Sequence, residues 1–121
     1  MKIVVRRIDH VQICVPMDAD EAARKFYLGI LGCLEIPKPP GFERFGGFWC
    51  TLGPVELHIG LDPVTQRTKG HPALEIEGVA GVRKYLEGLG VRTKDEPDIK
   101  GRTRFSFLDP FDNRIEFLEK D

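Results

Sequence analysis

The chain repeats one order of short apolar segments twice, and this duplication constrains its fold more than any other feature. Each half has a strand-like segment, an amphipathic helical segment that ends at a glycine, and three further strand-like segments. The helix ends are alike, with YLGILG at 27–32 and YLEGLG at 85–90. Internal repeats fold as equivalent supersecondary units. The sequence therefore predicts an α+β fold made of two βαβββ modules.

The predicted modules cover residues of about 6–62 and about 69–121, within one domain of 1–121. Alternating apolar residues and turn signals place the strands, and apolar residues near the helical period place the helices. In the first module we expect strands at Ile8–Val15, Cys33–Ile36, Phe48–Leu52 and Val55–Ile59, with Ala22, Phe26 and Ile30 on the inner face of the helix. In the second we expect strands at Ala73–Ile76, Val91–Thr93, Thr103–Leu108 and Arg114–Leu118, and a helix at Val79–Leu89.

Composition excludes several classes of function. The 121 residues carry 18 basic and 19 acidic side chains without a basic cluster, so nucleic acid is not an expected partner. No apolar run approaches the roughly 18 residues that span a bilayer. The three cysteines are odd in number and form no CxxC pair, which fits a reducing compartment. We expect a cytoplasmic protein without a membrane segment.

Histidine and glutamate recur at equivalent places in the two halves. His10 lies 46 positions before Glu56, and His71 lies 45 positions before Glu116. Each module thus begins with a histidine near its first strand and ends with a glutamate on its last. Strand side chains alternate between faces, so these four residues are expected opposite the helix-facing apolar residues, on the concave side of the sheet.

Two imidazoles and two carboxylates form a mixed nitrogen and oxygen set that suits a divalent first-row metal. We therefore predict a metal site made of His10, Glu56, His71 and Glu116. His58 lies two residues after Glu56 on the same face, so a set with His58 in place of Glu56 stays open. The matching offsets of Glu56 and Glu116 favour Glu56, which leaves His58 as a supporting or substrate-contacting residue.

The whole chain from residue 7 onward resembles the glyoxalase/bleomycin-resistance/extradiol dioxygenase superfamily, also called vicinal oxygen chelate proteins. The four metal-ligand candidates match that family's order of His, Glu, His and Glu, and FLDPFDNRIEFLE at 107–119 resembles its C-terminal signature. Asp112 stands where the signature usually has glycine, and aspartate tolerates the left-handed turn. The resemblance implies eight strands in an open, U-shaped sheet around a metal cleft.

The resemblance also implies a function. We expect a metal-dependent lyase or isomerase, in which Zn, Ni, Co, Mn or Fe holds neighbouring oxygens of a small substrate and Glu56 or Glu116 moves a proton. Alternatively, both glutamates are permanent ligands. Two other functions stay open, namely metal-free binding of a drug or metabolite and an extradiol dioxygenase reaction with iron. Members of this size form homodimers, in some of which each metal site takes two ligands from each subunit.

Three residues are candidates for contact with the substrate. His58 shares the face of Glu56. Trp49 and Phe48 alternate on one strand, so that one of them faces the cleft or both belong to the core. Arg104 is placed either to bind an anionic group of the substrate or simply to lie on the surface.

Overall fold

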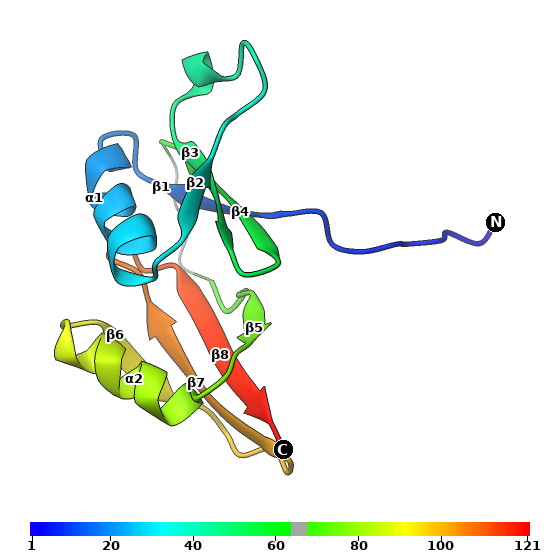
Figure 1. The fold of residues 1–121 in the computed structure, drawn as a ribbon, viewed down its shortest axis with the longest axis vertical. Helices are drawn as coiled ribbons and strands as arrows, with labels where there is room; N and C mark the ends of the chain where they lie inside the picture. Colours follow the sequence, from blue (N-terminus) through cyan, green and yellow to red (C-terminus); the bar gives the residue numbers. More distant parts are fainter. Residues whose placement is uncertain (64–67) are drawn as a thin grey trace.

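The computed structural model describes residues 1–63 and 68–121, and it confirms the α+β class and the two βαβββ modules (Figure 1). The first module contains β1 (Val11–Val15), α1 (Asp20–Arg24) continued by a π-helix (Lys25–Ile30), β2 (Leu34–Ile36), a 3-10 helix (Glu43–Phe45), β3 (Phe48–Leu52) and β4 (Val55–Leu61). The second contains β5 (Ala73–Glu75), α2 (Val79–Gly88), β6 (Arg92–Asp95), β7 (Arg102–Leu108) and β8 (Arg114–Lys120). The predicted linker at 62–70 lies partly outside the described residues.

The eight strands form two hydrogen-bonded sheets of four with the same topology. Their orders are β1-β4-β3-β2 and β5-β8-β7-β6. In each sheet the first strand pairs in parallel with the last, and the last two strands form the predicted antiparallel hairpin. Within the described part of the chain, each sheet has two edge strands that pair on one side only, β1 and β2 in the first module and β5 and β6 in the second.

The helix of the first module packs partly through the face that the sequence predicts. Phe26 is buried and Ile30 is half-buried against the core, as expected, whereas Ala22 is exposed and Ala23 and Tyr27 are buried. The inner face is set by Tyr27, whose hydroxyl donates a 2.7 Å hydrogen bond to the carboxylate of Asp109 in the second module. The prediction for Ala22 was wrong because helical period alone does not reveal this contact between distant residues.

The two modules share one hydrophobic core, which lies between the helices and the inner faces of the sheets. Phe26 of the first module and Phe107 of the second have ring centroids 6.4 Å apart. The side chain of Asn113 crosses between modules and donates to the carbonyl of Cys14 at 2.9 Å. The modules therefore contact each other through their helix-side residues.

The DPFDN turn before β8 is built around the buried carboxylate of Asp109. Its Oδ1 accepts from the backbone N–H groups of Phe111 (2.9 Å) and Asn113 (2.8 Å), and its Oδ2 accepts from Tyr27 and from the Asn113 amide. Asp112 stands where the family signature usually has glycine, and its φ of 72° is the left-handed conformation expected at that position. The turn thus fixes β8 to the first module.

We expect Tyr27→Phe to lower the free energy of unfolding by about 1–2 kcal/mol, because it removes a buried hydrogen bond to a carboxylate. Burial raises the pKa of the Tyr27 phenol, so it stays a hydrogen-bond donor. Chemical denaturation measures the change. Tyr85→Phe is the matched control: Tyr85 also donates across the modules, to the carbonyl of Ile30, but is 53% exposed. Its loss should cost less than about 0.5 kcal/mol, and equal losses would contradict the proposed role of Tyr27.

The first ten residues are an extended segment outside the sheets. The predicted strand at Ile8–Val15 begins only at Val11, because residues before it have no ladder partner. Ile3, Val4, Val5 and Ile8 are at least 76% exposed, and the segment leads away from the body (Figure 1). Among the described residues, no helix is long and apolar enough to cross a membrane.

Candidate metal centre

The second module brings His71 and Glu116 together. Glu116 on β8 pairs in register with Ala73 on β5, and His71 lies two residues before Ala73. The imidazole Nε2 of His71 is 3.0 Å from Oε1 of Glu116. Glu116 is only 5% exposed, and it lies on the opposite face of β8 from the core residues Ile115 and Phe117. The predicted nitrogen and oxygen donors of this module are therefore in contact.

The hydrogen bonds of His71 determine which of its ring nitrogens carries the proton. Its Nδ1 lies 2.9 Å from the carbonyl oxygen of Lys69, which only accepts, so Nδ1 carries the proton. In this tautomer the lone pair of Nε2 faces a carboxylate oxygen. Two acceptors at this separation need a second proton or a metal cation between them. The pair fits a metal, because ligating histidines have the same arrangement, with the other ring nitrogen bonded to an oxygen.

Arg104 lies against the same carboxylate. Its Nη1 donates to Oε1 of Glu116 at 3.2 Å, and its Nε and Nη2 donate to the carbonyl of Pro97 at 3.2 and 2.8 Å. The side chain is only 15% exposed. The structure therefore places this predicted substrate-binding residue next to the candidate ligand, where its charge offsets that of Glu116.

A second ion pair, not predicted from the sequence, extends along the same face of the second sheet. Glu96 accepts hydrogen bonds from the hydroxyl of Ser106 at 2.6 Å and from the guanidinium of Arg114. These contacts, that of Ser106 first, lower the pKa of the Glu96 carboxyl. The residues lie 10 and 18 positions apart in the sequence, so no local pattern indicates the pairing.

The first module brings His10, Glu56 and His58 together in a different way. Val11 pairs with Leu57, which places His10 and Glu56, one residue before each, at the same end of the parallel ladder. However, Oε2 of Glu56 accepts a 2.7 Å hydrogen bond from Nε2 of His58. His10 stacks on His58, with ring centroids 3.9 Å apart and planes 13° apart.

His10 shows the same nitrogen arrangement as His71. Its Nδ1 is 2.9 Å from Oδ2 of Asp9, so that the proton is on Nδ1 and Nε2 is the nitrogen with a lone pair. His58 differs, because its Nε2 is used as the donor to Glu56. This contrast favours Glu56 over His58 as the metal-facing group, with His58 orienting the carboxylate.

Trp49 completes a stack of three rings on the outer face of the first sheet. Its ring lies 3.7 Å from that of His58, with planes 3° apart. Its neighbour Phe48 is buried on the opposite face. Of the two aromatic residues on β3, Trp49 is thus the one that shares a face with the candidate site.

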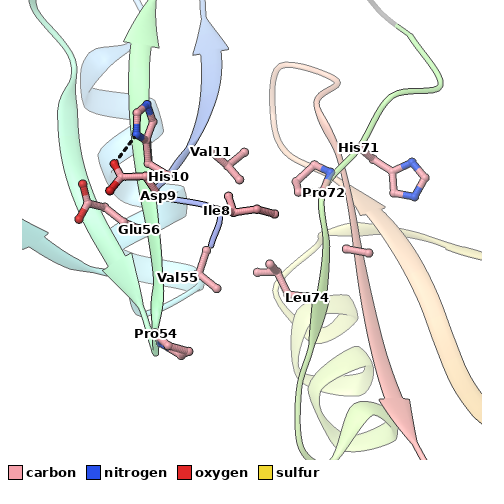
Figure 2. Close-up of a pocket in the computed structure, with 11 residues that line it drawn as sticks. Ile8, Asp9, His10, Val11, Pro54, Val55, Glu56, His71, Pro72 and Leu74 are labelled. Atoms are coloured by element: carbon pink, nitrogen blue, oxygen red, sulfur yellow. Dashed lines mark hydrogen bonds and ion pairs between the residues drawn. The ribbon is translucent and has the colours of Figure 1, made fainter. Parts of the chain in front are cut away.

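The donors of the two modules do not meet within one chain. A pocket of about 450 Å³ separates them, and its lining includes His10, Glu56 and His71. Figure 2 shows His10 and Glu56 on one side of this pocket and the His71 ring on the other, pointing away from them. The described residues contain no group of three or more His, Cys, Asp or Glu side chains that holds a metal ion. The modules contact each other through the core, and each outer face carries its own His–carboxylate pair.

Comparison with known proteins identifies the family. The crystal structure of a glyoxalase family protein from Bacillus anthracis superimposes with a TM-score of 0.92, at 36% identity over 100% of both chains. The chain belongs to the glyoxalase family. The fold is also that of the fosfomycin resistance protein FosX from Listeria monocytogenes, with a TM-score of 0.77, 19% identity and coverage of 98% of this chain and 96% of FosX. These proteins belong to the vicinal oxygen chelate superfamily.

FosX has been solved with Mn(II), and one of these complexes also holds an organic ligand. That structure is a variant complexed with Mn(II) and 1S,2S-dihydroxypropylphosphonic acid, and it superimposes with a TM-score of 0.76 at 20% identity over 98% of this chain and 95% of that one. No protein-family model and no curated protein sequence matches the chain.

Proposed function

We propose that this glyoxalase family member is a metal-dependent enzyme that moves a proton on a carbon beside two metal-held oxygens of a small substrate. The observation that carries the proposal is the arrangement of His10 and His71. In both, Nδ1 is bonded to an oxygen, which leaves Nε2 as the nitrogen that can act as a ligand, and in His71 that nitrogen contacts the buried carboxylate of Glu116. The Mn(II) complex of FosX supports a divalent metal, whether Zn, Ni, Co, Mn or Fe.

We further propose that each complete site lies between two copies of the chain. His10 and Glu56 would face His71 of the partner subunit and Glu116 of the partner subunit, which gives two sites per homodimer. The separation of the two pairs within one chain supports this arrangement, since neither pair alone supplies enough ligands for a closed site. The free edges of β1 and β5 border the same region.

In this site a bound divalent metal would supply Lewis acidity, which stabilises negative charge that develops on the substrate oxygens. Glu56 is the better candidate for the group that accepts the proton. It is half-buried, and among the described residues its carboxylate is held by His58. Glu116 contacts both Arg104 and His71, so it is the better candidate for a permanent ligand. His58 orients the Glu56 carboxylate, and Trp49 keeps the His58 ring in place.

The two alternative functions have less support. An extradiol dioxygenase site would need His58 or an equivalent histidine as a ligand to iron, and Nε2 of His58 donates to Glu56. Metal-free binding would not require the paired donors in both modules.

Solvent-deuterium exchange tests the proposal. The protein is stripped of metal and reloaded with Mn²⁺ or Zn²⁺. It is then incubated in D2O with small 2-hydroxyketones and 2-oxoacids while proton NMR follows the C–H beside the carbonyl. We expect deuterium incorporation that requires both protein and metal. Exchange that is unaffected by a chelator would contradict the proposal, and so would metal-dependent oxygen uptake with a catechol in place of exchange.

A further inference from the structure

A second pocket lies on the outer face of the first module, beside the ring stack. Its volume is about 340 Å³, which is in the range of pockets that hold small organic ligands. Trp49 and His58 line it, and the connection between β2 and β3 contributes Lys38, Phe42 and Phe45. His58, which donates to Glu56, thus belongs to both this pocket and the candidate metal centre.

The walls of this pocket are aromatic and accessible. The ring of Phe42 meets Trp49 edge-on at 6.0 Å and Phe45 at 5.7 Å. Phe42 is 45% exposed and Phe45 is 60% exposed, although both rings are large and apolar. A planar apolar ligand that lies against these rings would bury this exposed surface and gain aromatic contacts.

Lys38 supplies a positive charge at the same place. Its side chain is half-buried, and its ammonium donates to the carbonyl of Gly46. Among the described residues, no carboxylate forms an ion pair with it. An ammonium has three donor hydrogens, so two remain for a ligand. The pocket thus combines aromatic walls with one cation that has no carboxylate partner.

The loop that carries these groups is held in a fixed position. Gly46 and Gly47 both have φ values of 70°, a conformation that favours glycine. A Cβ atom on Gly47 would lie 2.0 Å from the carbonyl oxygen of Ile59 on β4, so only glycine permits this approach of the loop to the sheet. The pocket is therefore formed before a ligand arrives, which limits the entropic cost of binding.

We propose that this pocket binds a small aromatic carboxylate, with its ring against Trp49 and Phe42 and its carboxylate on Lys38. As a statement about the substrate, this rests on the proposed function, because the link to the candidate metal centre is His58, which lines this pocket and donates to Glu56. Binding itself requires no metal. The proposal therefore specifies an aromatic acid as the substrate class of the adjacent centre.

The fluorescence of Trp49 reports the occupancy of this pocket directly, because it is the only tryptophan in the chain. The full-length protein is titrated with phenylacetate and with its neutral isostere phenylacetamide, in the presence of EDTA, and calorimetry is run in parallel. We expect saturable quenching by phenylacetate and binding of phenylacetamide that is about 10-fold weaker, the effect of one charge-assisted contact worth 1.4 kcal/mol.

Variants separate charge from ring contacts. Lys38→Met should weaken phenylacetate about 10-fold and leave phenylacetamide unchanged, whereas Phe42→Ala should weaken both. Lys84→Met, on the exposed face of α2, is the matched control and should change neither. Unfolding curves of each variant verify that the fold is intact.

Equal affinities for acid and amide, or no binding of either ligand at millimolar concentration, would overturn the proposal. Because EDTA is present, these outcomes do not depend on the metal centre. Binding of phenylacetate together with an absence of metal-dependent exchange would uphold the pocket and refute the proposed function instead.

Discussion

Replacing Glu116 by alanine should lower the affinity for Mn²⁺ or Zn²⁺ by more than about 100-fold. Loss of a group that only hydrogen-bonds to a metal ligand lowers metal affinity by about 10- to 100-fold, so loss of the ligand itself should lower it by at least the upper figure. Glu116 is buried, and its Oε1 lies 3.0 Å from Nε2 of His71. Competition with a metal-sensitive dye measures the affinity, and mass spectrometry after purification measures the content.

The control for this loss is a glutamate on the neighbouring strand. Glu75 of β5 is exposed, and Glu75→Ala should leave metal affinity unchanged. Removal of Glu116 also leaves Arg104 without its carboxylate partner, so the double variant Glu116→Ala with Arg104→Leu distinguishes a charge effect from a lost ligand. If the double variant regained metal, Glu116 would be a charge partner of Arg104 and not a ligand.

Mixing two inactive variants should restore activity. His10→Ala disables the first module and Glu116→Ala disables the second, so each variant alone has no complete site. If sites form between chains, a mixed dimer has one site with both defects and one with neither. Random exchange makes half of the dimers mixed, so about one quarter of the unmutated activity should return.

Activity here means the metal-dependent deuterium exchange, or metal content if the substrate is not yet known. His71→Ala and Glu116→Ala both alter the second module, so a mixture of these two variants is the control. Every site in their mixed dimers still contains an altered second module, and no activity should return. If the His10 and Glu116 variants also failed to restore activity after verified subunit exchange, the site would belong to one chain.

The sequence was sufficient to predict the architecture, because the interactions that define each strand and helix of the repeat are local. Alternation of apolar residues placed β3 at Phe48–Leu52 without error, and glycine positions ended both helices within one or two residues. The similar spacings of His10–Glu56 and His71–Glu116, 46 and 45 positions, led to the prediction of two His–carboxylate pairs, of which only His71 and Glu116 are in contact. The register inside each module is not equal, however, because β1 pairs with β4 at Val11–Leu57 and β5 pairs with β8 at Ala73–Glu116.

The rest of the candidate site depends on contacts that leave no periodic signal. Glu56 bonds to His58 rather than to His10, and the ring stack with Trp49 arises because β3 and β4 pair at Trp49–His58. Arg104 is held by the carbonyl of Pro97, a backbone group that composition does not reveal. The donors of the first module lie apart from those of the second because of the way in which the two modules pack. The repeated sequence pattern does not determine that packing.

The unpaired edges of β1 and β5 affect how the chain behaves after synthesis. Each edge exposes a row of backbone N–H and C=O groups that will pair with any extended segment it meets. A second copy that covers these edges would therefore protect the protein from misassembly as well as complete its chemistry. Both properties would then depend on protein concentration. Below the concentration at which the chains dimerise, the protein would lose its catalytic activity and its protection against aggregation together.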